Sequence, residues 1–254
     1  PTITINELNA YTTKLVTDKN MVITVMGPQK EGVVLPTEEG ILASLKEVKA
    51  EKIDAYVDNV STKPLVENVA KPGKVTKVNA NNVFGTTEIV LNNGAKVVFK
   101  NTDFKEDEVS LTAFSNGGYS LADNKTLPSA TFATQIISNA GVGEFSKTDL
   151  DKMLAGKIVN VRTVIGEDYE GISGSASPKD FETMLQLVYL YFTAPREDVE
   201  SFNTYMERIK AFMANASADP RKAFSDSITI AMANRNPRVM PQDLEYLKDR
   251  KSVV

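Results

Sequence analysis

The chain has 254 residues, of which 42% are hydrophobic, and it carries a formal net charge of −4. This length and composition are enough for one large domain or two smaller ones, each with an apolar core. Charges of both signs are mixed along the chain, so no broad basic surface is available for nucleic acid. No apolar run approaches the roughly 18–20 residues of a membrane-spanning helix. We therefore expect neither nucleic acid nor a membrane span.

Cysteine and histidine are both missing from the sequence. Without cysteine there are no disulfides, no thiolate nucleophile and no cysteine-ligated zinc. Without histidine there is no Ser-His-Asp triad, no imidazole base and no zinc motif built on imidazole. A metal site made of carboxylates alone stays open, and such a site suits calcium or magnesium rather than zinc.

The first part of the chain alternates helical and extended patterns. Thr4 to Glu7 matches a capping box, and the apolar spacing after it predicts a helix over residues 5–16. The apolar run from Met21 to Met26, ended by Gly27-Pro28, predicts a buried strand. A second helix is predicted over residues 36–50. We expect residues 1–60 to be the C-terminal part of an α+β domain that begins upstream.

Residues 61–85 show no sustained hydrophobic period. They contain Pro64, Pro72-Gly73 and several asparagines and lysines, a composition typical of a connection between domains. The sequence therefore predicts a linker over this range.

β-Rich runs and turn signals dominate the next part of the chain. Five strands are predicted, over residues 86–91, 95–100, 109–115, 158–165 and 169–176. Asn92-Asn-Gly94 and Gly166-Glu-Asp lie between neighbouring runs, where they favour tight hairpin turns. We expect one antiparallel sheet of about five strands.

Helical patterns follow the strands. A helix is predicted from Pro128 to Ala140 and ends at Gly141, and a short one opens at Ser146. Three longer helices are expected over residues 178–195, over 197–214 and from Pro220, and a last helix from Pro241. By their spacing, we expect these apolar residues to face inward: Phe181, Met184, Leu185, Val188, Phe192, Val199, Phe202, Met206, Ile209, Met213, Phe224 and Ile228. The fold class is α+β, an antiparallel sheet with helices packed on one face.

Two groups of carboxylates could bind a metal ion or act in acid/base catalysis. Asp103, Glu106, Asp107 and Glu108 could form a calcium loop, but the group lacks the alternating ligands and central glycine of an EF-hand. Glu167, Asp168 and Glu170 could serve as an acid/base pair, but they lie at a predicted hairpin tip, where burial cannot split their pKa values. For both groups a solvated turn is the plainer interpretation.

Two further motifs are rich in glycine and serine. Ser173-Gly-Ser-Ala-Ser could offer a nucleophile, but no base accompanies it, so we interpret it as small residues packed under a helix. Asn116-Gly-Gly-Tyr119 could cradle a phosphate, but it lacks the remaining residues of a phosphate loop and predicts a tight turn. We assign no catalytic and no metal-binding residue, and the substrate-binding residues are unknown.

Several short sequence segments, by their order and spacing along the chain, resemble those of the insulinase/pitrilysin zinc peptidases. They are Leu91-Asn-Asn-Gly-Ala-Lys-Val-Val, Gly141-Val-Gly-Glu-Phe-Ser, Gly171-Ile-Ser-Gly-Ser-Ala-Ser and Phe192-Thr-Ala-Pro-Arg. Near the start of the chain, Val22-Ile-Thr-Val-Met-Gly-Pro and Leu35-Pro-Thr-Glu-Glu resemble the end of the preceding domain of that family. The resemblance therefore spans nearly the whole chain.

Peptidases of this family are built from four related α+β domains in two halves that close around a peptide, and only the first domain carries a His-x-x-Glu-His zinc helix. The resemblance implies that this chain comprises the tail of the second domain (1–60), the linker between the halves (61–85) and most of the third domain (86–254). The helix over 128–140 would take the place of the zinc helix, and residues 129–135 offer no imidazole or carboxylate. Zinc is therefore expected only in the N-terminal part of the parent protein.

By this resemblance, the chain would be a noncatalytic segment of a zinc-dependent endopeptidase and form part of a substrate-enclosing chamber opposite the zinc domain. Its partners would be the remaining domains of the same polypeptide and a peptide or unfolded protein substrate. A periplasmic or cell-envelope location is also implied. Two alternatives stay open: a catalytically silent binding or assembly module, and a zinc-independent hydrolase that uses carboxylates.

Overall fold

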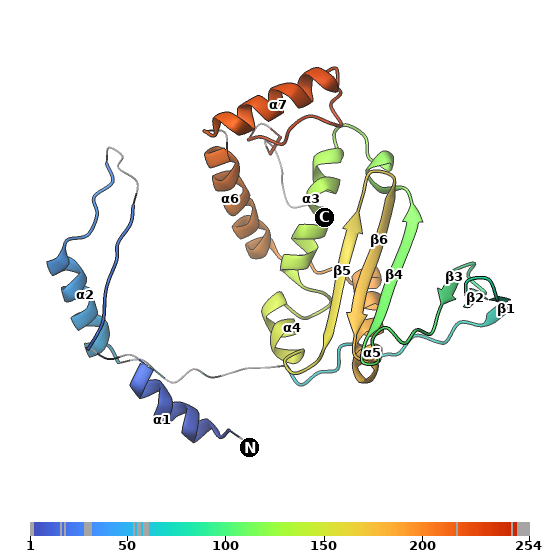
Figure 1. The fold of residues 1–254 in the computed structure, drawn as a ribbon, viewed down its shortest axis with the longest axis horizontal. Helices are drawn as coiled ribbons and strands as arrows, with labels where there is room; N and C mark the ends of the chain where they lie inside the picture. The colour runs from blue at the N-terminus through green and yellow to red at the C-terminus, as the bar shows by residue number, and fades with distance from the viewer. Residues whose placement is uncertain are drawn as a thin grey trace. The chain divides into compact units, whose positions relative to one another are not determined.

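The computed structural model describes residues 3–15, 17, 19–27, 32–52, 54, 57, 61–216, 218–244 and 246–247. The chain divides into two compact units, residues 1–58 and residues 59–254. The first unit contains helices α1 and α2, and the second contains the other helices and both sheets (Figure 1). Within the described ranges, no helix is long and apolar enough to cross a membrane.

The first unit consists of helices α1 (Ile5–Leu15) and α2 (Glu38–Ala50) and the segments around them. The capping box is present at α1, because Thr4 N–H donates to Glu7 at 2.8 Å and Glu7 N–H donates to Thr4 Oγ1 at 3.3 Å. The buried strand predicted over Met21 to Met26 is wrong. These residues have no strand partner among the described residues, and Val22 and Met26 are about nine-tenths exposed. An apolar run forms a buried strand only when a second strand or a core covers it.

The second unit opens with a small antiparallel sheet. Its strands β1 (Val75–Asn81), β2 (Thr86–Leu91) and β3 (Lys96–Phe99) lie in the order β1-β2-β3. The predicted Asn-Gly hairpin joins β2 to β3, and Gly94 adopts a φ of 86° there. Strand β1 lies within residues 61–85, the range that was predicted as a linker because its hydrophobic residues show no regular spacing.

A second antiparallel sheet follows in the order β4-β6-β5. It contains β4 (Val109–Asn116), β5 (Val159–Ile165) and β6 (Tyr169–Ala176), and β6 pairs with both neighbours in continuous register. Antiparallel pairing and the mixed α+β class are as predicted. The single five-stranded sheet is wrong, because β2 and β3 pair with β1 and not with β4.

The described residues of the second unit also form five α-helices: α3 (Leu127–Ala140), α4 (Lys147–Met153), α5 (Phe181–Thr193), α6 (Val199–Ala216) and α7 (Pro220–Met232). Helix α5 packs on β5 and β6, and α3 packs on β5 and α6. Short 3₁₀ turns precede α3 at Gly118–Leu121 and α5 at Pro178–Asp180. In Figure 1, α3 runs beside the β4-β6-β5 sheet, with α6 on its other side.

Two apolar clusters hold the helices together. One joins α3 to α6 and contains Phe132, Phe202, Tyr205, Met206, Met213 and Leu247. The other contains Val142, Phe145, Leu150, Leu187 and Leu190 and lies where the loop after α3 meets α4 and α5. Gly141 ends α3 with a φ of 96°, as the predicted C-terminal cap requires.

Several inward-facing positions differ from the prediction. On α5 the buried residues are Thr183, Met184, Leu187 and Leu190, and Phe192 is 69% exposed. On α6 the predicted Phe202, Met206 and Met213 are buried, but Val199 is 55% exposed. Phe224 on α7 is 70% exposed, so the prediction that it faces inward is wrong. Helical spacing identifies an apolar face but not whether a neighbour covers it.

The helix predicted from Pro241 is not formed over residues 241–244 and 246–247, which adopt turns and irregular backbone. The remainder of that prediction, residues 245 and 248–254, lies outside the described residues. Leu247 nevertheless reaches the core, where it is 5% exposed beside Phe132 and Tyr205.

Candidate functional site

The double-glycine turn after β4 docks on the tip of the β5–β6 hairpin. Three backbone hydrogen bonds of 2.8 Å join them, from Gly117 to Asp168, from Tyr119 to Gly166 and from Ser120 to Glu167, with the N–H of the first residue donating each time. Gly118 has a φ of +59°, and a Cβ there would lie 2.4 Å from the carbonyl oxygen of Gly166. The two backbones can approach this closely only because the residue is glycine. Three of the turn's amides are thus already bonded, which favours the tight-turn interpretation over a phosphate cradle.

Glu170 fastens the same turn from β6. Its carboxylate accepts hydrogen bonds from the backbone N–H of Gly118 and from Ser115 Oγ, the latter at 2.7 Å. The Gly118 bond is the main cause of a lowered pKa at Glu170, and the Ser115 bond adds to it. A general acid requires a raised pKa. Glu170 is therefore a structural acceptor, and the predicted acid/base alternative is not supported here.

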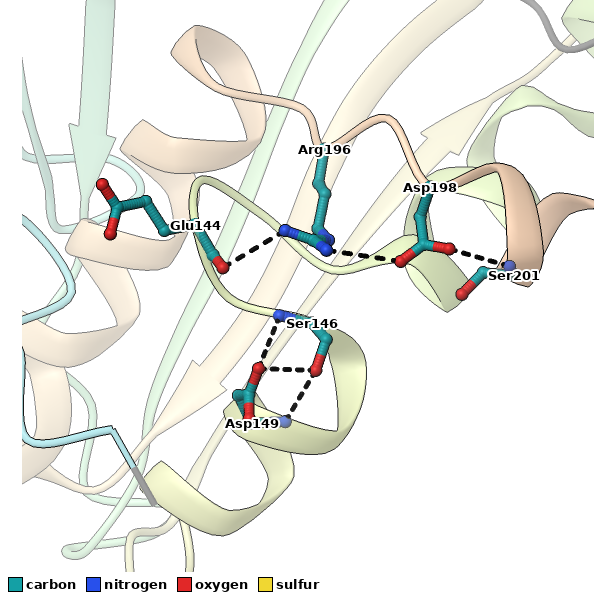
Figure 2. Close-up of polar contacts among 6 residues, drawn as sticks. All are labelled: Glu144, Ser146, Asp149, Arg196, Asp198 and Ser201. Atoms are coloured by element: carbon teal, nitrogen blue, oxygen red, sulfur yellow. Dashed lines mark hydrogen bonds and ion pairs between the residues drawn. The ribbon is translucent and has the colours of Figure 1, made fainter. Parts of the chain in front are cut away.

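Arg196 connects the Gly-Val-Gly-Glu-Phe-Ser loop to the start of α6 (Figure 2). Its Nη1 donates to the carbonyl oxygen of Glu144 at 3.2 Å, and its Nη2 lies 3.4 Å from Asp198 Oδ2. Asp198 in turn accepts from the backbone N–H of Ser201 at 2.8 Å, which fixes the first turn of α6. The pKa of Asp198 is lowered, first by the Ser201 backbone bond and to a smaller extent by Arg196. The planar guanidinium can bridge the two segments in this way because it carries several donors.

Ser146 and Asp149 form the capping box of α4, below Arg196 in the same view (Figure 2). Ser146 Oγ accepts from the N–H of Asp149 at 3.1 Å, and the Asp149 carboxylate accepts from the Ser146 N–H at 3.1 Å. Backbone contacts tie the loop further, since Gly143 N–H donates to Ala194 O at 2.7 Å. The Gly-Val-Gly-Glu-Phe-Ser motif is thus a rigid joint between α3, α4 and the start of α6.

A buried carboxylate, Asp180, performs a similar role at the other end of the sheet. It is 5% exposed and accepts from Ser177 Oγ at 2.6 Å and from the backbone N–H of Ile158 at 2.9 Å. The bond from Ser177 is the main cause of its lowered pKa. Asp180 therefore stays ionised and satisfied and is not available as a base.

The other predicted motifs occupy separate places. Asp103, Glu106, Asp107 and Glu108 lie on an exposed turn, where Glu108 pairs with Lys105. Ser173 lies on the central strand β6, and a Cβ at the neighbouring Gly174 would lie 3.0 Å from Met184 Sδ on α5. Small residues are thus required there for the helix to pack on the sheet. The structure does not bring these motifs together with Glu167 or Asp168.

Helix α3 lies where the resemblance places a zinc helix. Its middle residues include Phe132, buried in the α3–α6 core, and Thr134, whose hydroxyl donates to Gln135 Oε1 at 3.0 Å. Histidine and cysteine are missing from the whole sequence, and the described residues contain no group of three or more carboxylates that could hold a metal ion. The side chains on this helix do not fit zinc.

Sequence reasoning did not single out Asp180, Asp198 or Arg238. Asp180 has the Ser-x-x-Asp spacing of a cap, and Asp198 precedes a helix, so cap signals could have identified both. Arg238 donates from Nη1 to the carbonyl oxygen of Ala122 at 3.0 Å and also bonds Tyr119 O. Because more than 100 residues separate it from these partners, no local signal identifies it.

No protein-family model matches the chain. The chain is 27% identical over 232 residues to an Arabidopsis thaliana protein described as "Zinc protease PQQL-like", a match that covers 90% of this chain and 21% of that protein. It is 30% identical over 103 residues to the "Probable zinc protease PqqL" of Haemophilus influenzae, covering 41% of this chain and 11% of that protein.

Two solved structures share the fold. The periplasmic protease PqqL from Escherichia coli matches with a TM-score of 0.62 and 18% identity over 84% of this chain and 23% of its own length. A mutant of the ferredoxin protease FusC, solved in complex with Arabidopsis ferredoxin, matches with a TM-score of 0.65 and 20% identity over 87% of this chain and 24% of its own. The chain thus spans at most about a quarter of these proteins. The chain is similar in sequence to two proteins described as zinc proteases of the PqqL type, and it shares the α+β fold of the solved PqqL and FusC structures, in agreement with the resemblance inferred from its motifs.

Proposed function

We propose that this chain is a noncatalytic segment of a larger zinc-dependent endopeptidase and forms part of the wall of its substrate chamber, opposite the zinc domain. One observation carries the proposal. Nine-tenths of the chain aligns with a zinc protease, yet its sequence contains no histidine or cysteine to bind zinc. In such enzymes zinc activates the attacking water. This chain has no ligand set for that step, so the metal belongs to another part of the parent.

The same proposal assigns the parts of the chain. Residues 1–60 are the end of a preceding α+β domain, residues 61–85 connect two halves of the parent, and residues 86–254 belong to a peptidase-like domain without zinc. The rigid joint around Arg196 suits a wall, because it fixes the loop after α3 against α6 without any reactive group. By analogy with the E. coli PqqL structure, we propose a periplasmic location.

Peptidase activity and zinc content test the proposal directly. The chain is assayed alone and after mixing with the upstream segment of its own gene product, with an unfolded protein as substrate. We expect no zinc and no cleavage by the chain alone, and cleavage on mixing that a chelator abolishes and zinc restores. Cleavage by the isolated chain would overturn the proposal. Binding of the unfolded substrate without cleavage in either case would favour the silent binding module.

A further inference from the structure

A pocket of about 500 Å³ lies beside the double-glycine turn. Three segments that are far apart in the sequence line it: the turn with Tyr119 and Ser120, the β5–β6 hairpin tip with Glu167 and Asp168, and residues 236–240 together with Gln242 and Tyr246. Side chains of α3, among them Thr131, form another part of the lining. This volume lies within the range of pockets that bind small ligands or single peptide side chains.

The pocket is preorganised by its own backbone. The turn and the hairpin tip are joined by the three 2.8 Å hydrogen bonds described above, and Arg238 bonds the turn through the carbonyl oxygens of Tyr119 and Ala122. Each lining segment is therefore held before any ligand arrives. A fixed site loses less conformational entropy on binding than a mobile one.

The unsatisfied charge of the pocket is negative. Glu167 and Asp168 are exposed at its rim, and within the described part of the chain neither carboxylate has a hydrogen bond or ion pair. Of the described residues that line the pocket, Arg238 alone is cationic, and its Nη atoms donate to the carbonyl oxygens of Ala122 and Tyr119. The carboxylates thus remain available to a cation from outside.

Aromatic surface accompanies this charge. Tyr119 and Tyr246 both line the pocket, and the Tyr246 hydroxyl lies 3.2 Å from Thr131 Oγ1. Burial is the main cause of a raised pKa at Tyr119, so its ring stays neutral. Neutral tyrosine rings attract cations and pack against the methylene stem of a long side chain.

We propose that this pocket binds a lysine or arginine side chain of a peptide, with the ammonium or guanidinium group at Glu167 and Asp168 and the stem against Tyr119. That the peptide is a protease substrate rests on the proposed function, but binding itself does not. A calcium ion is a poorer occupant, because it takes about six to eight oxygen ligands and Glu167 and Asp168 are the two acidic residues among the described residues that line the pocket. An acidic peptide is disfavoured by the same two carboxylates.

Peptide binding to the intact chain tests the proposal. Three fluorescently labelled, otherwise neutral peptides differ only in a central lysine, norleucine or glutamate, and their affinities are measured by anisotropy at low ionic strength. We expect the lysine peptide to bind at least about tenfold more tightly than the norleucine peptide. We also expect added salt to weaken lysine binding, because the contact is partly exposed.

A matched pair of variants localises the effect. Glu167→Gln with Asp168→Asn removes both rim charges and leaves the backbone acceptors of the hairpin tip in place, and it is expected to weaken lysine-peptide binding about tenfold or more. Glu106→Gln with Asp107→Asn makes the same charge change on the exposed turn before β4 and is expected to leave binding unchanged. Equal urea midpoints of both variants would show that neither unfolds.

Equal affinity for lysine and norleucine peptides, equal effects of the two double variants, or no binding of any peptide would each overturn the proposal. These results are independent of zinc-dependent cleavage on mixing, because the binding experiment uses this chain alone. Failure of cleavage with intact lysine binding would therefore contradict only the proposed function. Cleavage on mixing without any preference for the lysine peptide would contradict only the proposal that the pocket binds a lysine or arginine side chain.

Discussion

Gly141 has a backbone conformation that favours glycine, and neighbouring main-chain atoms leave no room for a side chain there. Its φ is 96°, and an added Cβ would lie 2.2 Å from the carbonyl oxygen of Phe145. We expect Gly141→Ala to lower the free energy of unfolding by about 2–4 kcal/mol, because the substitution adds backbone strain and a clash with main-chain atoms. Urea denaturation followed by circular dichroism measures the loss.

Gly156 provides the matched control. It also has a positive φ, 81°, but no atom lies within 4 Å of its would-be Cβ. Gly156→Ala therefore carries the cost of the left-handed conformation alone, about 1 kcal/mol. If both substitutions cost the same, the close contact with Phe145 would not contribute to stability.

Glu170 should make stability depend on acid pH. Its pKa is lowered from 4.5 by the bonds from Gly118 and Ser115, so the folded state favours the ionised carboxylate. This contribution is complete above about pH 5 and is lost as the pH falls through the lowered pKa. Glu170→Gln should therefore lower the urea midpoint at pH 7, and the difference from the natural sequence should shrink toward about pH 3. A difference that stays constant with pH would contradict the ionised role.

Local sequence signals predicted the residues that act locally. The capping box at Thr4 and the C-terminal cap at Gly141 follow from spacing alone, and both are present. Arg196 and Arg238 act on carbonyl groups 52 and 116–119 positions away. Such partners are set by the tertiary fold, so no motif in the neighbourhood of these arginines could have identified their role.

Phe132 is the buried aromatic residue through which helix α3 packs on α6. The ring is 7% exposed and makes edge contacts with Tyr205 and Tyr246 at centroid distances of 6.4 and 6.2 Å. Phe132→Ala should cost about 3–5 kcal/mol, because it leaves a cavity between α3 and α6. Phe114→Ala, at a ring that is 75% exposed, should cost less than about 1 kcal/mol. Thermal and urea unfolding of the two variants compares them, and similar losses would place the core elsewhere.

Most helices and strands of the second unit were predictable, because their apolar residues recur at clear helical or strand spacing. The partners of the strands were not, because alternation fixes which face is apolar and leaves open which strand lies alongside. Strand β1 illustrates this point. Val75–Asn81 is mostly polar and is exposed at all but one position, and it is a strand because it pairs along β2. The apolar run Met21 to Met26 shows the converse, since it has strong β propensity and no pairing partner among the described residues.

The molecule as a whole should respond little to pH near neutrality. It contains no histidine, and among the described residues every carboxylate whose pKa is shifted has a lowered pKa, which moves its titration further into acid. Burial raises the pKa values of Tyr191 and Tyr205, so their contribution is lost only above about pH 10. We expect a free energy of unfolding that is nearly constant between about pH 6 and 8 and falls on both sides. A slope within that window, measured by urea titration in a series of buffers, would contradict this account.

Composition and fold together limit what the chain does. The sequence alone excluded imidazole and thiolate chemistry, and the fold agrees with the family that its motifs resembled. The pocket beside the double-glycine turn could not have been predicted, because residues from four separate parts of the chain line it. The proposed binding site thus depends on a surface assembled by the fold more than on any single motif.

Strand β4 has a further consequence for the chain when it is handled by itself. It lies at one edge of its sheet, and its eight residues Val109–Asn116 include no charge and no proline. Proteins usually protect an open sheet edge with charged residues or proline, because the unpaired backbone groups of an edge strand can template the addition of another strand. Lateral self-assembly through this edge, starting from the native state and growing with concentration, is therefore the aggregation route that this fold leaves least guarded.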